Sequence, residues 1–198
     1  PGEGRILGYL GGIHTGEGRM DEARRHFERA LVIHRECGER RSQGIDLGNL
    51  GDLAYGEGDL PSAARHLEQA IGICDEVTPA AAGAFRGSLA LLLAQQGKRD
   101  EAQSLLETGA PLVEAYPEEH AKFLAKKGQV CHLAGDADGA QASLEQAQAL
   151  AAELKVTDNS EVAQDIRELE AVLGDEPEEA SDNKRDLPLV EAEPLPEA

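Results

Sequence analysis

The chain has 198 residues, of which 29% are charged and only 3% are aromatic, and its formal net charge is −19 at pH 7. This acidic balance argues against a nucleic-acid-binding or membrane-surface protein, because phosphates and anionic lipids repel such a chain and it has no basic stripe. No apolar run approaches the roughly 18 residues that span a bilayer. We therefore expect a cytoplasmic protein.

A glycine five residues before an alanine recurs four times along the chain. The steps between the glycines are 40, 39 and 38 residues, and the pairs are Gly18/Ala23, Gly58/Ala63, Gly97/Ala102 and Gly135/Ala140. Self-similarity at this period is the signature of stacked repeats. Apolar residues at helical spacing before and after each glycine predict two helices joined by a turn in each unit.

Small residues recur at two further positions of each unit. One set precedes the glycine by seven residues: Gly11, Gly51, Ala90 and Gly128. The other follows a bulky apolar residue (Phe27, Leu67, Leu106, Leu144) by three residues: Ala30, Ala70, Gly109 and Ala147. We expect the two helices to approach closely at these sites, so that a bulky side chain at Gly51 or Ala63 would overpack the crossing.

The turns contain residues that end one helix and start the next. The recurring glycine suits the left-handed conformation that ends a helix. We expect an aspartate to start each second helix, and the candidates are Asp21, Asp59, Asp100 and Asp136. Prolines suit the first turn of a helix, and Pro61, Pro79 and Pro117 lie at such positions.

Two units depart from the pattern. In the third, Arg86 occupies an apolar position, and Pro111 falls inside the expected second helix, where proline removes a backbone hydrogen bond and kinks the helix. In the first, four glycines within the opening helix lower its own stability. We expect that helix to rely on a neighbour, and we expect Pro1 to mark a cut through a larger protein or a processed end.

The spacing Leu47, Leu50-Gly51, Gly58, Ala63, Leu67 and Ala70 resembles the tetratricopeptide repeat (TPR). The period near 40 and the connector from Cys37 to Leu53 are similar to the long repeats of G-protein-modulator proteins related to LGN and Pins, and to repeats of bacterial regulators. The resemblance implies an all-α, right-handed TPR-type α-solenoid of about four repeats with a C-terminal capping helix. We place the repeats at about 4–40, 41–78, 79–116 and 117–157.

A capping helix is predicted over 158–174. Residues Asp158 to Glu161 offer helix-start chemistry like a capping box, an apolar stripe follows at helical spacing, and Gly174 ends the helix; the stripe is Val162, Ile166, Leu169 and Leu173. Residues 175–198 form an acidic tail with four prolines, for which we expect disorder. An alternative is that its apolar patch around Leu189 acts as a peptide for the groove.

The resemblance also implies a concave groove lined by the first helix of each repeat. In repeats two to four the implied lining residues are Asn49, Asp52, Tyr55, Ser88, Leu91, Gln95, Lys122, Lys126, Gln129 and His132, and in the first repeat they are Arg5, Tyr9, Gly12 and Thr15. Related repeats use an asparagine at the position of Asn49 to hold a ligand's backbone. Lys122 and Lys126 lie one turn apart, so they form either a positive spot for an acidic segment or carboxylate or an ordinary solvated face.

No catalytic, cofactor or metal site is predicted. Six histidines form no paired ligand spacing; His34 and Cys37 come nearest, one turn apart, and would need two further ligands. The three cysteines (Cys37, Cys74 and Cys131) are expected to be buried, reduced thiols. No carboxylate pair stands out as acid and base, and no phosphate-binding loop is present, so we predict a protein that is not an enzyme.

The predicted function is a protein–protein interaction scaffold that binds a peptide or partner domain in its groove, as part of a larger bacterial regulatory or signalling protein. Its partner could be acidic, or could be its own tail, 175–198. The alternative is a self-assembly module that forms a homo-oligomer by stacking repeats or by exchanging tails between grooves.

Overall fold

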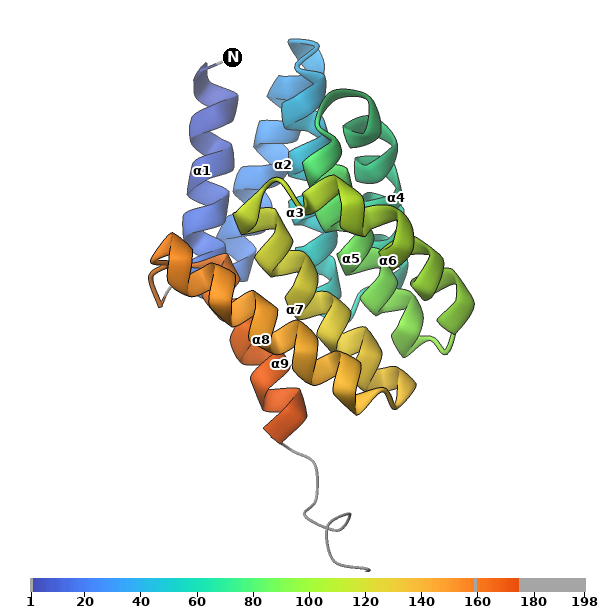
Figure 1. Ribbon diagram of the computed structural model, residues 1–198. Helices are drawn as coiled ribbons and strands as arrows, with labels where there is room; N and C mark the ends of the chain where they lie inside the picture. The colour runs from blue at the N-terminus through green and yellow to red at the C-terminus, as the bar shows by residue number, and fades with distance from the viewer. Residues whose placement is uncertain (1, 159, 175–198) are drawn as a thin grey trace, which may run out of the picture.

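The computed structural model describes residues 2–158 and 160–174, and within these ranges the chain forms nine α-helices and no strand (Figure 1). The helices are α1 (Gly2–Gly16), α2 (Met20–Glu36), α3 (Arg40–Gly56), α4 (Leu60–Val77), α5 (Pro79–Gln95), α6 (Arg99–Val113), α7 (Pro117–Ala134), α8 (Ala137–Leu154) and α9 (Glu161–Gly174). The predicted all-α repeat array with a terminal helix is confirmed. The tail, 175–198, lies outside the described residues, so the structure tests neither hypothesis about it.

The helices pack pairwise, α1 on α2, α3 on α4, α5 on α6 and α7 on α8, and each pair follows the next along a curved array (Figure 1). Between neighbouring pairs in the first half of the array, α3 contacts α2 and α5 contacts α4. Between pairs in the second half, α7 contacts α5 more than α6, and α9 contacts α7 more than α8. The α9 helix therefore occupies the place that the first helix of a further repeat would take.

The small residues lie at close helix crossings, as predicted. A side-chain carbon on Gly11 would lie 2.6 Å from the ring of Phe27, and one on Gly51 would lie 2.7 Å from Leu67. Gly128 instead meets Leu169 of α9, at 2.5 Å. The alanines of both sets are buried in the core. Bulky and tiny side chains thus interlock within each pair and between α7 and α9.

The turn glycines adopt the left-handed conformation, with φ between 73° for Gly18 and 80° for Gly135. In each of these four turns the residue directly after the glycine caps the next helix. Asp59 and Asp136 occupy that position, and their carboxylates accept hydrogen bonds from the amides of Ser62 (3.2 Å) and Gly139 (2.9 Å).

The prediction was wrong for Asp21 and Asp100, which lie in the first turns of α2 and α6, two residues beyond the cap. The caps there are Arg19 and Lys98, neither of which accepts a capping hydrogen bond. A carboxylate inside the first turn still interacts favourably with the amino end of a helix. The prolines at 61, 79 and 117 do fall in first turns.

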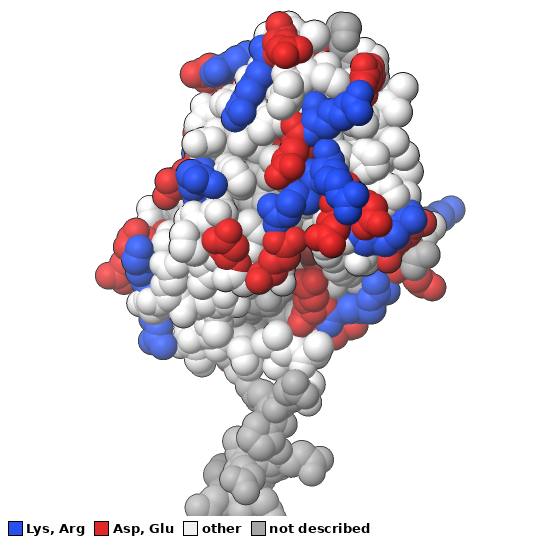
Figure 2. Space-filling view, turned by 180° about the vertical axis from the view of Figure 1, so that it is seen from behind, with Lys and Arg blue, Asp and Glu red and all other residues white. Residues whose placement is uncertain are grey.

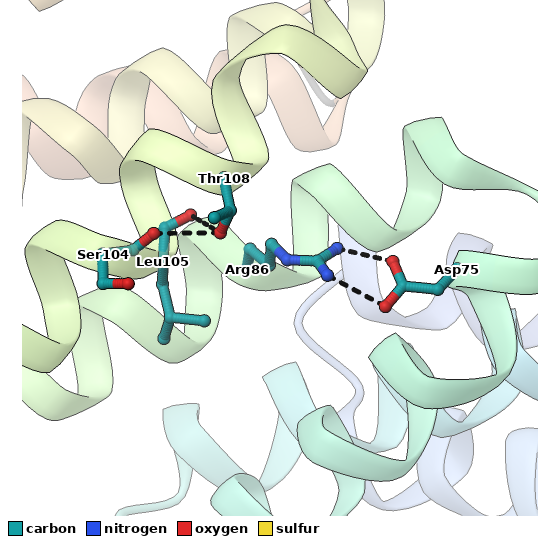
Figure 3. A network of polar contacts seen from close by, with 5 residues as sticks. All are labelled: Asp75, Arg86, Ser104, Leu105 and Thr108. Carbon is teal, nitrogen blue, oxygen red and sulfur yellow. Dashed lines mark hydrogen bonds and ion pairs between the residues drawn. The ribbon is translucent and has the colours of Figure 1, made fainter.

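The irregular third repeat keeps both of its helices. Arg86 of α5 forms a two-pronged ion pair with Asp75 of α4, with distances of 2.7 and 2.9 Å (Figure 3). A bidentate pair fixes the guanidinium in one orientation, so the charged residue at this position links two repeats. The α6 helix continues past Pro111 to Val113. Pro111 therefore does not end the helix, and the kink expected there stays a prediction.

Three apolar side chains anchor α9, as its sequence predicts. Val162, Ile166 and Leu169 are buried in a cluster with residues of α7 and α8, and Leu173 packs against its edge. The hydroxyl of Ser160 caps the helix by accepting a hydrogen bond from the Ala163 amide. The prediction for the cysteines was wrong in one respect, because Cys37 is exposed, whereas Cys74 is buried and Cys131 half-buried.

Candidate functional site

A groove of about 400 Å³ opens on the side of the array formed mainly by the odd-numbered helices. Its apolar surface comes from α2, α3 and α5, and includes Met20, Phe27, Ile45, Leu53, Ala81, Ala84, Phe85 and Leu91. Neutral polar side chains lie beside this surface: Thr15, Asn49, Tyr55, Ser88 and Gln164. The charged lining residues are Asp52, Glu57, Glu119, Lys122, Lys126, Glu161, Asp165 and Glu168.

Most of the residues assigned to the groove from the sequence lie in this lining. They are Asn49, Asp52, Tyr55, Ser88, Leu91, Lys122 and Lys126, together with Thr15 of the first repeat. Because first helices stack side by side in a repeat array, residues at equivalent positions fall on one wall. The binding role of these residues stays a prediction.

Other residues assigned to the groove lie outside its lining. Gln95, at the end of α5, donates a hydrogen bond to the Tyr55 hydroxyl at the groove edge. Gln129 is buried in α7 and its amide nitrogen lacks a partner among the described residues, while His132 is half-buried in the last turn of the same helix. In α1, Arg5, Tyr9 and Gly12 also lie outside the lining, and Tyr9 is 68% exposed.

Sequence reasoning missed the contribution of α9. Glu161, Gln164, Asp165 and Glu168 of this helix line the groove. Their spacing places them on one face, beside the apolar stripe that anchors α9. The polar face of α9 could have been recognised from this spacing. Its place in the groove could not, because residue spacing does not show how far the array curves back toward α3.

The two lysines do not form the free positive spot considered from the sequence. The Lys122 ammonium lies 3.3 Å from the Glu161 carboxylate, and the Lys126 ammonium lies 3.1 Å from that of Asp165. Although burial acts to lower the pKa of Lys126, the carboxylates of Asp165 and Asp52 raise it overall. Lys126 therefore stays charged and is held by acidic neighbours.

Burial also acts on the acidic residues of the groove. It raises the pKa of Asp52, and the ammonium of Lys126 and the hydroxyl of Ser88 only partly oppose this. Burial likewise raises the pKa of Glu168, again against the effect of Lys126. For both carboxylates the loss of solvent outweighs the nearby positive charge of Lys126.

The nearest metal motif of the sequence does not assemble a metal site. The ring of His34 is buried and its Nδ1 atom lies 2.6 Å from Asp46, whereas Cys37 is exposed. Over residues 2–158 and 160–174, no three His, Cys, Asp or Glu side chains are grouped to hold a metal ion. In the same ranges, no helix is long and apolar enough to cross a membrane.

Charges of both signs share the surface. On the face shown in Figure 2, Lys and Arg side chains are interspersed with Asp and Glu side chains and form no continuous basic area. Ion pairs between different segments of the array include Arg24 with Glu57, Arg29 with Glu3 and Arg40 with Glu76. This face lacks the basic stripe with which proteins hold nucleic acid.

Known proteins are similar to this chain in sequence pattern and in fold. Two tetratricopeptide repeat models match it, one over residues 3–76 and the other over residues 83–108 and 123–146. Together they cover more than half of the chain. No curated protein sequence matches it significantly.

Solved structures share the fold at low sequence identity. The crystal structure of BtubC (BKLC) from P. vanneervenii has a TM-score of 0.58 and 20% identity, over 78% of this chain and 65% of that chain. The nearly identical TPR-like repeats of a putative kinesin light chain from Podosopora anserina have a TM-score of 0.54 and 19% identity, over 84% of this chain and 94% of that chain. A second structure of those repeats, of a variant form, gives the same score and identity, over 86% of each chain.

At such identities the likeness shows the fold alone, and this chain spans just under two thirds of BtubC. The finer resemblance to the LGN and Pins type stays a prediction. The repeat matches, the paired helices and the left-handed glycine turns agree with one another. The chain therefore belongs to the tetratricopeptide repeat proteins.

Proposed function

We propose that the chain is an interaction scaffold that holds a peptide or a partner domain in its groove, and that it acts by binding rather than by catalysis. The observation that carries this proposal is the groove of about 400 Å³, in which apolar surface lies beside a few polar side chains. Such a combination is typical of binding sites. Repeat arrays use extended concave surfaces in the same way.

Asn49 is the polar side chain best placed to hold a peptide backbone. It is half-buried in the lining and forms no side-chain hydrogen bond with other described residues. An amide both donates and accepts hydrogen bonds, as an extended peptide with unpaired main-chain groups requires. We further propose, from the resemblance to repeats of bacterial regulators, that the scaffold serves a bacterial regulatory or signalling protein in the cytoplasm.

Filling the groove is expected to abolish peptide binding. Peptides selected from a random displayed library on the wild-type chain should lose at least about tenfold in affinity, equivalent to about 1.4 kcal/mol, when Asn49→Trp places an indole in the groove. The matched control is Gln69→Trp, an equal replacement at an exposed site of α4. Titration of labelled peptides measures both. Equal affinity for the two variants would contradict binding in the groove.

A second candidate function, self-association, is favoured by an exposed apolar face of α1. Ile6, Tyr9 and Ile13 are 61%, 68% and 55% exposed, and their spacing puts them on one side of the helix. Contiguous exposed apolar surface marks interaction sites. If copies associate through this face, the mass in solution should rise with concentration, and Ile6→Lys with Ile13→Lys should prevent the rise. A wild-type chain that stays monomeric leaves this function without support.

A further inference from the structure

The groove contains far more negative than positive charge. Six carboxylates line it, and they come from α3, the turn after α3, α7 and α9, whereas only Lys122 and Lys126 carry positive charge there. Within the lining the formal sum is thus −4, from six acidic and two basic side chains. A low-dielectric wall around charges of one sign concentrates their field in the cavity.

The two lysines already have partners on α9. Lys122 pairs with Glu161 at 3.3 Å and Lys126 pairs with Asp165 at 3.1 Å. An acidic ligand would have to compete with these two carboxylates for the ammonium groups. The α9 helix buries Val162, Ile166 and Leu169 almost completely, so apolar packing holds the competing carboxylates beside the lysines.

Three of the six groove carboxylates form ion pairs: Glu161 with Lys122, Asp165 with Lys126, and Glu57 with Arg24. The other three do not. They are Asp52 of α3, Glu119 of α7 and Glu168 of α9, and none of them forms an ion pair with another described residue. They lie on separate helices around one cavity. The ammonium of Lys126 does not offset the rise that burial causes in the pKa values of Asp52 and Glu168.

The apolar part of the groove lies beside these carboxylates. Ile45, Ala81 and Ala84 contribute to it, and each is half-buried, so part of its surface is open to the groove. Lysine and arginine side chains place their aliphatic stems along apolar surface while their charged ends reach a polar neighbour. The groove therefore offers apolar surface for the aliphatic stem of a Lys or Arg side chain and a carboxylate for its charged end.

We propose that the partner of the groove is a cationic segment of another protein, in which Lys or Arg side chains reach Asp52, Glu119 and Glu168. The inference rests on the proposed function and names the partner's chemistry. It differs from the acidic partner considered as one possibility from the sequence, because the α9 carboxylates already pair with the lysines. Such electrostatic complementarity sets which partners are accepted and raises the rate at which they associate.

The test compares short labelled peptides in which alanine alternates with lysine, with glutamine or with glutamate, titrated by fluorescence anisotropy at physiological ionic strength. We expect the lysine peptide to bind most tightly and the glutamate peptide least. Because the whole chain is acidic, the informative comparison is between variants. Asp52→Asn with Glu168→Gln should weaken binding of the lysine peptide about tenfold.

The matched control, Glu28→Gln with Glu68→Gln, removes the same charge from exposed sites on α2 and α4 and should change affinity less than about twofold. Lys122→Gln, which frees the carboxylate of Glu161, should raise the affinity for the lysine peptide. Equal losses in the groove and control variants, or tighter binding of the glutamate peptide, would overturn the cationic partner. If library-selected neutral peptides still lose affinity in Asn49→Trp, the groove function survives that failure. If no peptide distinguishes Asn49→Trp from wild type, both proposals fail.

Discussion

Replacing Gly83 with alanine is expected to lower the free energy of unfolding by about 1–3 kcal/mol. Gly83 lies where α5 crosses α6, and a side-chain carbon built on it would lie 2.9 Å from the carbonyl oxygen of Gly109 and 2.8 Å from Val113. The first of these neighbours is backbone, so a rotamer change cannot relieve the contact. The two helices must move apart, and the core around Val113, which is fully buried, must loosen.

The matched control is Gly72→Ala on α4. Gly72 lies within its helix, is exposed, and has nothing within 4 Å of a built side-chain carbon. Alanine should therefore raise the free energy of unfolding by about 0.5–1 kcal/mol, because glycine is the weaker helix former. Urea unfolding followed by circular dichroism measures both variants. A rise in both variants would show that α5 and α6 do not cross as closely as the distances at Gly83 indicate.

The repeat pattern was predictable because it is local and recurs. The glycine before each second helix needs the left-handed conformation, and its spacing from the following alanine is set within one turn and one helix, so four copies reinforce one another. The small residues could be read in the same way. Gly109 was recognised by its position in the repeat, but its partner Gly83 was missed, although Gly4, Gly44 and Ala121 stand at the equivalent positions of the other units.

The helix caps show how a local signal can still be misassigned. The aspartates at 21 and 100 follow their turn glycine by three residues, whereas those at 59 and 136 follow it directly. In all four turns the capping position is the one directly after the left-handed glycine. Alignment on the glycine, rather than on the nearest aspartate, would have separated the two pairs.

The charge of the groove could not be predicted, because it depends on contacts between distant parts of the chain. Lys122 and Glu161 are 39 residues apart, as are Lys126 and Asp165. Asp52, more than seventy residues before Lys126, interacts with it electrostatically. Such pairings depend on how far the array curves. That curvature is the sum of small differences in the angle at each helix crossing.

Replacing His34 with alanine should have the largest effect on stability, a loss of about 3–5 kcal/mol at neutral pH. His34 of α2 and Asp46 of α3 are 2% and 4% exposed and lie 2.6 Å apart, and the Gln43 amide donates to the His34 carbonyl beside them. Removing the imidazole leaves a buried carboxylate without its partner. It also leaves a cavity between the first two repeats, where Gly4 of α1 packs against the ring.

The pH dependence of stability provides the control for this interpretation. Burial raises the pKa of Asp46 from 3.8 to about 6, although the neighbouring His34 opposes the rise. A carboxyl group whose pKa is higher in the native state than in the unfolded state binds more protons when folded, so its contribution to stability declines as the pH rises through that interval. Asp46→Asn keeps the shape and an acceptor oxygen but does not titrate.

The stability of the wild type relative to Asp46→Asn should therefore fall as the pH rises from 3.8 to about 6 and stay level above it. In His34→Ala the loss should be smaller at the acid end, where Asp46 can be protonated, than at neutral pH. Urea unfolding of the three proteins across this range measures both differences. A pH-independent gap between wild type and Asp46→Asn would mean that Asp46 has the same pKa folded and unfolded, and that the desolvation assigned to it is absent.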